Sequence, residues 1–306
     1  MSAIKKVALA GATGMLGQPI LHHLLAQGFT VTILTRDSSK TANTLSQQPN
    51  AAAYSIAQVD YSSSESLEAA IKGHDAVVSA LARPAQKDEE RLIDASIAAG
   101  VPRFIPSAFG GDMTVPWVRE QPFWADKLQQ EAYLLSKVEA SGGELSFTML
   151  TNGPIFDFVM QAKLFLNLPE RKITLWDGGD KRLSVTTKDT IGRAVAEALK
   201  LPAETRNKNL FIEGAVVCQR QLLELAHELT PDEDWTVTEM QSLPLFKAAQ
   251  EKWSQGVRGP AVGPGFLLRG LFTEGFGGAF DRTDNDLLHI DRMSEKEVKD
   301  FLFAYL

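Results

Sequence analysis

The chain of 306 residues is short of cysteine, of basic charge and of long apolar runs, and each shortage excludes a class of protein. Its single cysteine, Cys218, cannot form an intrachain disulfide, so we expect no disulfide framework and a reducing compartment. With 31 basic against 38 acidic residues, the formal net charge of −7 argues against nucleic acid as the main partner. No run is long and apolar enough to span a bilayer, and no signal peptide fits at the start, so we expect a cytoplasmic protein without a membrane partner.

The five histidines are scattered without the spacing of metal ligands, so we expect no metal site. What is present is the composition of an ordinary globular protein, with 44% hydrophobic and 23% charged residues. The length allows a full core and a second, smaller domain. We therefore expect a monomer or a homodimer that binds a small-molecule substrate.

The stretch VALAGATGMLG, residues 7–17, predicts a dinucleotide-binding turn. A short apolar run precedes three glycines at a spacing of three, and apolar residues at helical spacing follow from 18 to 27. Gly11 would allow the tight turn, Gly14 the close approach of a pyrophosphate, and Gly17 the packing of helix against strand. The GxxGxxG spacing differs from the standard GxGxxG fingerprint, and the alternative is a turn needed only for packing.

Backbone amides at the start of this first helix would face the phosphates, where the helix dipole favours negative charge. The residues that would contribute are Thr13, Met15 and Leu16, together with the glycines.

The second predicted strand, residues 30–34, indicates which nucleotide binds. Its end faces the adenosine ribose, where an NAD enzyme places an acid. Here the strand is followed by Thr35 and Arg36, with Lys40 one turn further on. A guanidinium and an ammonium suit a 2′-phosphate, so we expect NADP(H); the alternative is two surface cations on a solvated helix start. Asp37 comes one residue too late, and we expect it to face solvent or to cap the next helix.

Strands and helices alternate through residues 1–155, which predicts an α/β fold with a Rossmann-type, doubly wound parallel sheet that binds NADP(H). Residues 156–306 are predicted to form a smaller C-terminal α+β substrate-binding or lid region, some elements of which return to the sheet. Within it, residues 255–280 are rich in glycine and phenylalanine and predict a loop with short helical turns. Ser294–Glu297 is a capping box that predicts the start of the final helix.

Ligands of a doubly wound sheet bind beyond the carboxyl ends of its strands, so the residues that follow the fourth, fifth and sixth predicted strands are candidates for the cofactor site. These are Ser79, Ala80, Leu81, Ser107, Phe109, Asn152, Gly153 and Pro154. Phe109 and Phe156 could flank a nicotinamide or an aromatic substrate, and the alternative for both is core packing. Phenylalanine, tryptophan and methionine residues crowd the second half, which favours a largely apolar or aromatic metabolite.

Four features together resemble the isoflavone reductase-like and NmrA-like group of atypical short-chain dehydrogenases. They are Gly-Ala-Thr-Gly-x-x-Gly near the start, Pro106-Ser107-x-Phe109-Gly110, a lysine opening the next helix, and Asn152-Gly153-Pro154. The segments Asp177-Gly178-Gly179 and Thr190-Ile191-Gly192-Arg193 also resemble this group, especially its fungal members. The resemblance covers essentially the whole chain. It implies an NADPH-dependent reductase that transfers hydride to a carbonyl or enone.

In the reductases of this group, the lysine near the start of that helix is catalytic. The matching residue here is Lys127, so the resemblance implies that Lys127 is the proton donor and also contacts the cofactor. One departure is Ala108, which stands where the plant reductases usually have glutamate.

Three alternatives stay open on the sequence. Tyr133 and Lys137 form a YxxxK pair, the signature of ordinary short-chain dehydrogenases, in which the lysine lowers the tyrosine pKa and both side chains share a helix face. An NmrA-like protein can instead bind NADP(H) as a redox-sensing regulator without catalysis. The fold could also serve a reaction that is not a reduction, such as an isomerisation.

Overall fold

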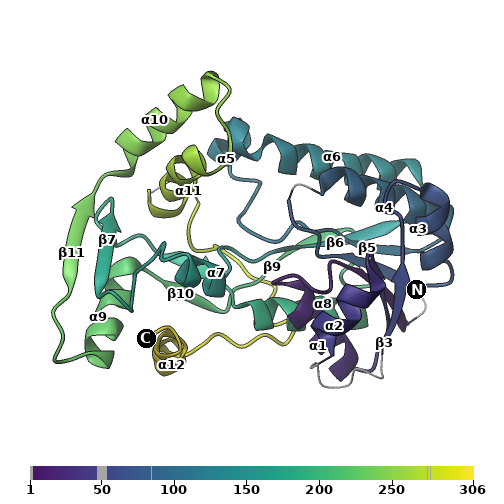
Figure 1. The fold of residues 1–306 in the computed structure, drawn as a ribbon, viewed down its shortest axis with the longest axis horizontal. Coiled ribbons are helices and arrows are strands. Elements are labelled where there is room, and N and C mark those ends of the chain that lie inside the picture. Colours follow the sequence, from purple (N-terminus) through teal and green to yellow (C-terminus); the bar gives the residue numbers. More distant parts are fainter. Residues whose placement is uncertain (1–2, 47–53, 84, 274, 276) are drawn as a thin grey trace.

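The computed structural model describes residues 3–46, 54–83, 85–273, 275 and 277–306 (Figure 1). Seven strands make its central sheet: β1 (Lys6–Ala10), β2 (Thr30–Thr35), β3 (Tyr54–Gln58), β4 (Ala76–Ser79), β5 (Arg103–Ile105), β6 (Ser146–Thr151) and β9 (Lys208–Phe211). All neighbours in the order β3-β2-β1-β4-β5-β6-β9 pair in parallel. This is the order of a dinucleotide-binding sheet, and the predicted Rossmann-type fold is confirmed.

Helices cover both faces of this sheet. One face carries α1 (Gly17–Ala26), α2 (Ser38–Leu45) and α8 (Lys188–Lys200), and the other α3 (Ser64–Ile71), α4 (Gln86–Ala98) and α6 (Ala125–Ala140). Successive side chains of a strand point to opposite faces, so Val7 and Leu9 of β1 enter one apolar core while Ala8 and Ala10 enter the other. A strand buried on both faces must be apolar throughout, as this one is.

Two elements of the Rossmann-type part, the covering helix α8 and the strand β9, come from beyond residue 155. Helix α8 packs against α1, and a glycine permits the contact: a Cβ at Gly192 would lie 2.6 Å from the backbone oxygen of Pro19. Strand β9 extends the sheet beside β6. The sheet therefore has its last strand from the second half of the chain.

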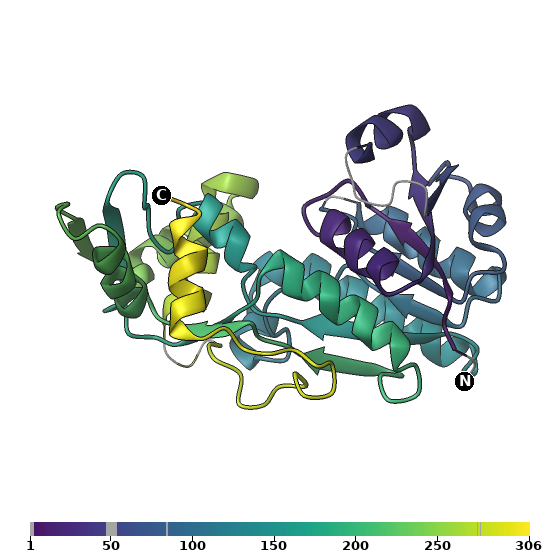
Figure 2. The ribbon, with the colours of Figure 1, turned by 90° about the horizontal axis from the view of Figure 1, so that it is seen from below.

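The remaining elements gather at one end of the molecule, on the left in Figures 1 and 2 and away from β3. They comprise β7 (Lys172–Trp176) paired in parallel with β11 (Thr236–Met240), and β8 (Leu183–Val185) paired antiparallel with β10 (Ala215–Val217). The helices are α5 (Pro116–Glu120), α7 (Phe156–Gln161), α9 (Gln219–Leu229), α10 (Ser242–Ser254), α11 (Gly263–Phe272) and α12 (Glu295–Phe303). The predicted capping box starts α12: Ser294 accepts from the Glu297 amide, and Glu297 from the Ser294 amide. None of the helices in the described ranges has the length and apolarity to cross a membrane.

The prediction of a loop with short helical turns over 255–280 is only partly right: the segment has a 3-10 turn, Gly259–Ala261, but the ten-residue helix α11 occupies its centre. One of the glycines that suggested a loop, Gly265, allows α11 to pack closely on α10. A Cβ at Gly265 would lie 2.5 Å from the Ala249 Cβ and 2.7 Å from the Leu245 oxygen. Tertiary packing therefore outweighs the low helix propensity of glycine in this segment.

Candidate active site

The glycine turn between β1 and α1 is tightly packed. Gly11 has a φ of +80°, and a Cβ there would lie 2.5 Å from the Ala80 oxygen at the end of β4. A Cβ at Gly17 would collide with the Gly11 oxygen, which the Gly14 amide also reaches at 3.0 Å. Gly11 and Gly17 therefore have the packing roles that the sequence predicted.

The same turn offers hydrogen-bond donors to a ligand. Within the described chain, the backbone amides of Thr13, Met15 and Leu16 have no hydrogen-bond partner, and all three precede the first turn of α1. Unpaired amides at a helix start attract phosphate oxygens, both as donors and through the helix dipole. The residues present thus fit a pyrophosphate.

The end of β2 carries exposed cations. Arg36 and Lys40 are both exposed, and across the described ranges neither forms an ion pair. The Asp37 side chain accepts a hydrogen bond of 2.9 Å from the Lys40 amide and caps α2, which confirms the predicted cap. The acid between the two cations is therefore engaged by the helix, and the cations remain available to a 2′-phosphate.

A cavity of about 890 Å³ lies beyond the carboxyl ends of β5 and β6. Its inner wall includes Phe109, Lys127 and the segment 153–155, and its outer wall comes from α11 and residues 277–282. Apolar side chains form much of the surface: Val118, Trp124, Phe158, Val159, Leu183, Phe211, Leu267 and Leu271. The volume is within the range of about 300–1,000 Å³ typical of small-molecule sites.

Lys127, in the first turn of α6, points into this cavity. Its Nζ donates a hydrogen bond of 3.0 Å to the Phe109 oxygen. Burial lowers the pKa of Lys127 to about 8, with the Arg83 charge acting in the same direction and the Glu89 charge against it. Gly110, with a φ of +143°, leaves room for the amine, since a Cβ there would lie 3.1 Å from Nζ. An amine with this pKa is a competent acid near neutral pH.

Asn152 and Gly110 join the β5 and β6 ends of this wall. The Gly110 amide donates to Asn152 Oδ1 at 2.9 Å, and the Asn152 amide donates to the Gly110 oxygen at 3.0 Å. Gly153 follows with a φ of +65°, where a Cβ would collide with the Ser184 oxygen. Gly153 and Pro154 line the cavity.

Tyr133 and Lys137 lie on another side of α6. Tyr133 is six residues beyond Lys127, which is about 240° around a helix. Both members of the pair contact Asp94 of α4: the Tyr133 hydroxyl donates at 2.7 Å and Lys137 Nζ lies 2.6 Å from the carboxylate. The pair is not among the residues that line the cavity.

The structure also separates the two candidate phenylalanines. Phe109 lines the cavity, whereas Phe156 is fully buried and stacks on Phe301 at a centroid distance of 4.4 Å. Phe156 therefore takes the core-packing alternative, because the turn of α7 directs it inward. Phe158, two residues later on the same helix, lines the cavity and is 47% exposed.

The end of β4 and the loop after β5 meet at the carboxylate of Glu89, which the sequence analysis did not predict. Glu89 of α4 is 2% exposed, and it accepts hydrogen bonds from the Ser79 hydroxyl at 2.5 Å and from the Ser107 amide at 3.2 Å. The Ser107 hydroxyl donates to the Leu81 oxygen at 2.8 Å. A signal for Glu89 exists in the sequence, since it shares the spacing of the buried α4 residues Leu92, Ile93 and Ser96.

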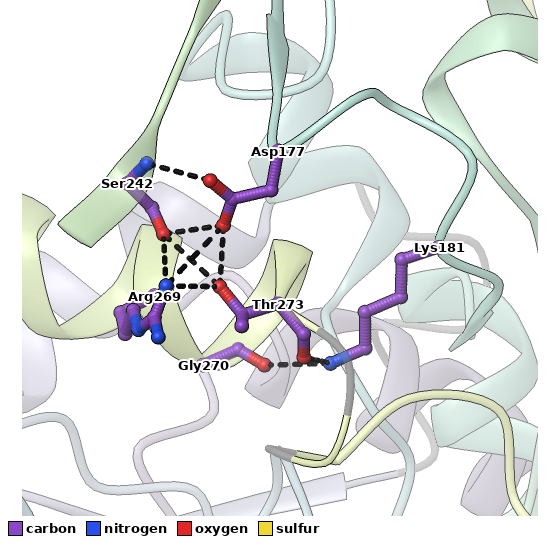
Figure 3. Close-up of polar contacts among 6 residues, drawn as sticks. All are labelled: Asp177, Lys181, Ser242, Arg269, Gly270 and Thr273. Carbon is purple, nitrogen blue, oxygen red and sulfur yellow. Dashed lines mark hydrogen bonds and ion pairs between the residues drawn. The ribbon is translucent and has the colours of Figure 1, made fainter.

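A polar cluster holds the outer wall of the cavity (Figure 3). Asp177 follows β7, and its carboxylate accepts from the Ser242 amide at 2.8 Å and from the Ser242 and Thr273 hydroxyls at 2.5 Å each. Arg269 Nη1 lies 3.6 Å from the same carboxylate. Lys181 Nζ donates to the backbone oxygens of Gly270 and Thr273, at the end of α11. The cluster thus joins β7, the start of α10 and the end of α11.

Comparison with known proteins places this site in a family. The model of the NmrA-like family matches residues 3–230. The chain belongs to the NmrA-like family. This confirms the resemblance inferred from the glycine turn and from the segments 106–110 and 152–154.

Three known proteins are similar to this chain, one in sequence and two in fold. Oxidoreductase aprR of Aspergillus flavus is 31% identical over 305 residues, which cover 96% of this chain and 97% of the relative. The structure of AtPrR2 with NADP+ and (+)pinoresinol matches with a TM-score of 0.81 at 18% identity and covers 100% of both chains. The leucoanthocyanidin reductase–NADPH complex from Vitis vinifera matches with a TM-score of 0.79 at 20% identity and covers 98% and 99% of the two chains.

Proposed function

We propose that this NmrA-like protein is an NADP(H)-dependent reductase in which Lys127 donates a proton to the substrate oxygen during hydride transfer. The observation that carries the proposal is the position of Lys127. Its amine is held by the Phe109 oxygen, its pKa is lowered by burial to about 8, and it faces the cavity at the carboxyl ends of the strands.

The cofactor part of the proposal has three supports. The glycine turn offers free amides for a pyrophosphate, and Arg36 and Lys40 offer cations for a 2′-phosphate. A relative of 31% identity is named an oxidoreductase. Structures of the same fold are described as complexes with NADP+ or NADPH. When bound, NADPH would supply the hydride.

The substrate part of the proposal depends on the cavity. Its aromatic side chains Phe109, Phe158 and Phe211 favour a small apolar or aromatic metabolite with a carbonyl or enone oxygen. The Lys127 ammonium would donate its proton to that oxygen as the carbon receives hydride, and the neutral amine would then be reprotonated from solvent. The apolar walls would exclude water from the reacting atoms.

The test compares Lys127→Met with Lys137→Met, which removes an ammonium from the α4-facing side of the same helix. Oxidation of NADPH is followed by absorbance with a panel of aromatic ketones, enones and quinones. Lys127→Met should reduce turnover by about 10²–10⁴-fold, the usual contribution of a general acid. NADPH affinity should change little in either variant, and Lys137→Met should keep its turnover.

Other outcomes would favour the alternatives. An inactive Tyr133→Phe beside an active Lys127→Met would assign the reaction to the YxxxK mechanism. Full activity in both variants would mean that water or the substrate supplies the proton. A parent protein that binds NADPH tightly and turns over none of the panel would support an NADP(H)-binding redox sensor.

A further inference from the structure

The feature of interest is the buried carboxylate of Glu89, which the proposed proton transfer does not use. Glu89 lies in the first turn of α4, and its Oε2 accepts from the Ser79 hydroxyl at 2.5 Å. The Ser107 amide donates to both carboxylate oxygens, at 3.2 and 3.3 Å. The carboxylate thus joins the end of β4 to the loop after β5. Burying a carboxylate is costly unless it is hydrogen-bonded or paired, and these bonds offset that cost.

The same loop holds Lys127. Ser107 is bound by Glu89, and two residues further on the Phe109 oxygen accepts from Lys127 Nζ. Glu89 therefore fixes one end of the short segment whose other end receives the amine. A shift of Ser107 would move the oxygen that orients Lys127.

Charge links the two groups as well. The Glu89 carboxylate attracts the Lys127 ammonium, whereas Arg83, on the loop after β4, repels it. The charge of Asp126, on α6, attracts that of Arg83, and Asp112, Asp281 and Arg282 line the same cavity. Burial raises the pKa of Glu89 to about 7, against the hydrogen bonds from Ser79 and Ser107 and the Lys127 charge. Burial lowers the pKa of Lys127 to about 8, and each charge favours the ionised form of the other group.

We propose that Glu89 is a positioning residue for Lys127: it fixes the loop that orients the amine, and its negative charge keeps the amine protonated between turnovers. The kinetic consequence rests on the proposed function, while the attraction between the two groups does not. After Lys127 has given its proton to the substrate oxygen, ionised Glu89 favours the return of a proton from solvent to the neutral amine.

The direct test measures the titration of Lys127 in Glu89→Gln. The substituted glutamine keeps the size of the side chain and can keep hydrogen bonds to Ser79 and Ser107. The full-length protein is labelled with trace acetic anhydride over a pH series, and the labelled lysine peptides are quantified by mass spectrometry. The titration midpoint of the Lys127 amine should fall by about one pH unit or more, since an opposite charge nearby is lost.

The matched control is Asp94→Asn, which removes one negative charge from the same helix. Asp94 pairs with Lys137, and its hydrogen bond raises the pKa of that lysine. In this variant the Lys137 midpoint should fall and the Lys127 midpoint should stay. An unchanged Lys127 midpoint in folded Glu89→Gln would overturn the proposal.

Activity provides a second readout that a merely structural role would not produce. Glu89→Gln should lose activity relative to the parent at pH 8, where its lysine is neutral, and regain most of it at pH 6. A uniform loss at every pH would mean that Glu89 only supports the fold, and would overturn the proposal.

A reciprocal measurement decides the case if Glu89→Gln does not fold. Linkage requires that removing the Lys127 charge raise the pKa of Glu89, which carbon-13 NMR of the carboxyl groups can follow in Lys127→Met. An unchanged Glu89 midpoint would overturn the coupling. If the charges of Glu89 and Lys127 are coupled but Lys127→Met remains fully active, the proposed proton donor is rejected and the coupling stands. Failure of the coupling and failure of the proposed function are therefore distinguishable.

Discussion

At the scale of single residues, three neighbours at the end of β2 bear on the proposed cofactor contacts. Asp37 uses its carboxylate to cap α2, whereas an NAD site directs an acid at the ribose. Arg36 and Lys40 stay exposed beside it. A carboxylate in the position of Arg36 would bind a 2′-hydroxyl and repel a 2′-phosphate, whereas a guanidinium does the opposite.

Arg36→Ala should therefore weaken binding of NADPH much more than binding of NADH. Loss of charge-assisted hydrogen bonds costs about 1.5–3 kcal/mol, or roughly ten- to a hundredfold in affinity. Calorimetric titration with both nucleotides measures the difference. Arg91→Ala, on α4, serves as a charge-matched control and should leave both affinities unchanged. Equal weakening of the two nucleotides by Arg36→Ala would show that Arg36 does not contact the 2′-phosphate.

Short motifs predicted part of the site at this scale. The glycine turn and the lysine that opens α6 follow from local spacing and family resemblance. Glu89 could not be found in this way, because its partners Ser79 and Ser107 lie 10 and 18 residues away and meet it only at the ends of two strands. Phe156 and Phe158 differ by two residues, yet the turn of α7 sends one into the core and the other to the cavity.

At the scale of elements, the contact between α1 and α8 shows how a glycine in a helix can be stabilising. Gly192 lies in α8 against the Pro19 backbone, where an added Cβ would be 2.6 Å from the carbonyl carbon and oxygen. Backbone atoms cannot move aside as a flexible side chain can. The two helices, from opposite halves of the chain, therefore pack closely only while this position lacks a side chain.

Gly192→Ala should destabilise the protein, although alanine favours an exposed helix over glycine by about 1 kcal/mol. Overpacking of this kind costs about 1–3 kcal/mol. Urea unfolding followed by circular dichroism measures the free energy of unfolding. Gly263→Ala in α11 is the matched control, because its Cβ would have its nearest neighbour at an ordinary 3.7 Å. Stability equal to the parent in Gly192→Ala would mean that α1 and α8 can separate without cost.

The first half of the chain was predictable element by element, because apolar strands alternate with amphipathic helices over short distances. In the second half, the capping box predicted the start of α12, but β11 and α11 could not be found in the same way. All residues of β11 are exposed, so no apolar pattern marks it as a strand, and its partner β7 lies far back in the sequence. Helix α11 carries glycines that local propensity assigns to a loop, and only distant contacts explain them: Gly265 packs on α10, and Gly270 lies against Trp117.

At the scale of the whole molecule, the cavity has walls from two different parts of the chain. The inner wall belongs to the Rossmann-type sheet and carries Lys127, and the outer wall belongs to α11 and the segment after it. The Asp177 cluster anchors that outer wall (Figure 3). Burial alone would raise the pKa of Asp177, but hydrogen bonds from Ser242 and Thr273 and the Arg269 charge hold it below its ordinary value. The cluster therefore stabilises the ionised form.

Asp177→Asn should lower the free energy of unfolding at pH 7 by about 1.5–3 kcal/mol, because hydrogen bonds to a charged acceptor are lost. A carboxylate whose pKa is lower in the folded than in the unfolded state stabilises the fold fully at any pH above the unfolded-state pKa. This stabilisation is lost as the pH falls through the folded-state pKa. The difference in free energy of unfolding between parent and variant should therefore narrow as the pH drops below 3.8, the ordinary pKa of an aspartate. Urea unfolding at several pH values measures it.

The same variant separates the two walls by function. Because the outer wall does not include the glycine turn or Arg36, NADPH affinity should stay near that of the parent, while KM for a reducible substrate should rise. Asp180→Asn is the matched control: Asp180 is 76% exposed and pairs with Arg220 at the surface, so its loss should leave stability and KM unchanged. A parallel loss of NADPH affinity in Asp177→Asn would show that the cluster supports the whole fold and not the outer wall alone.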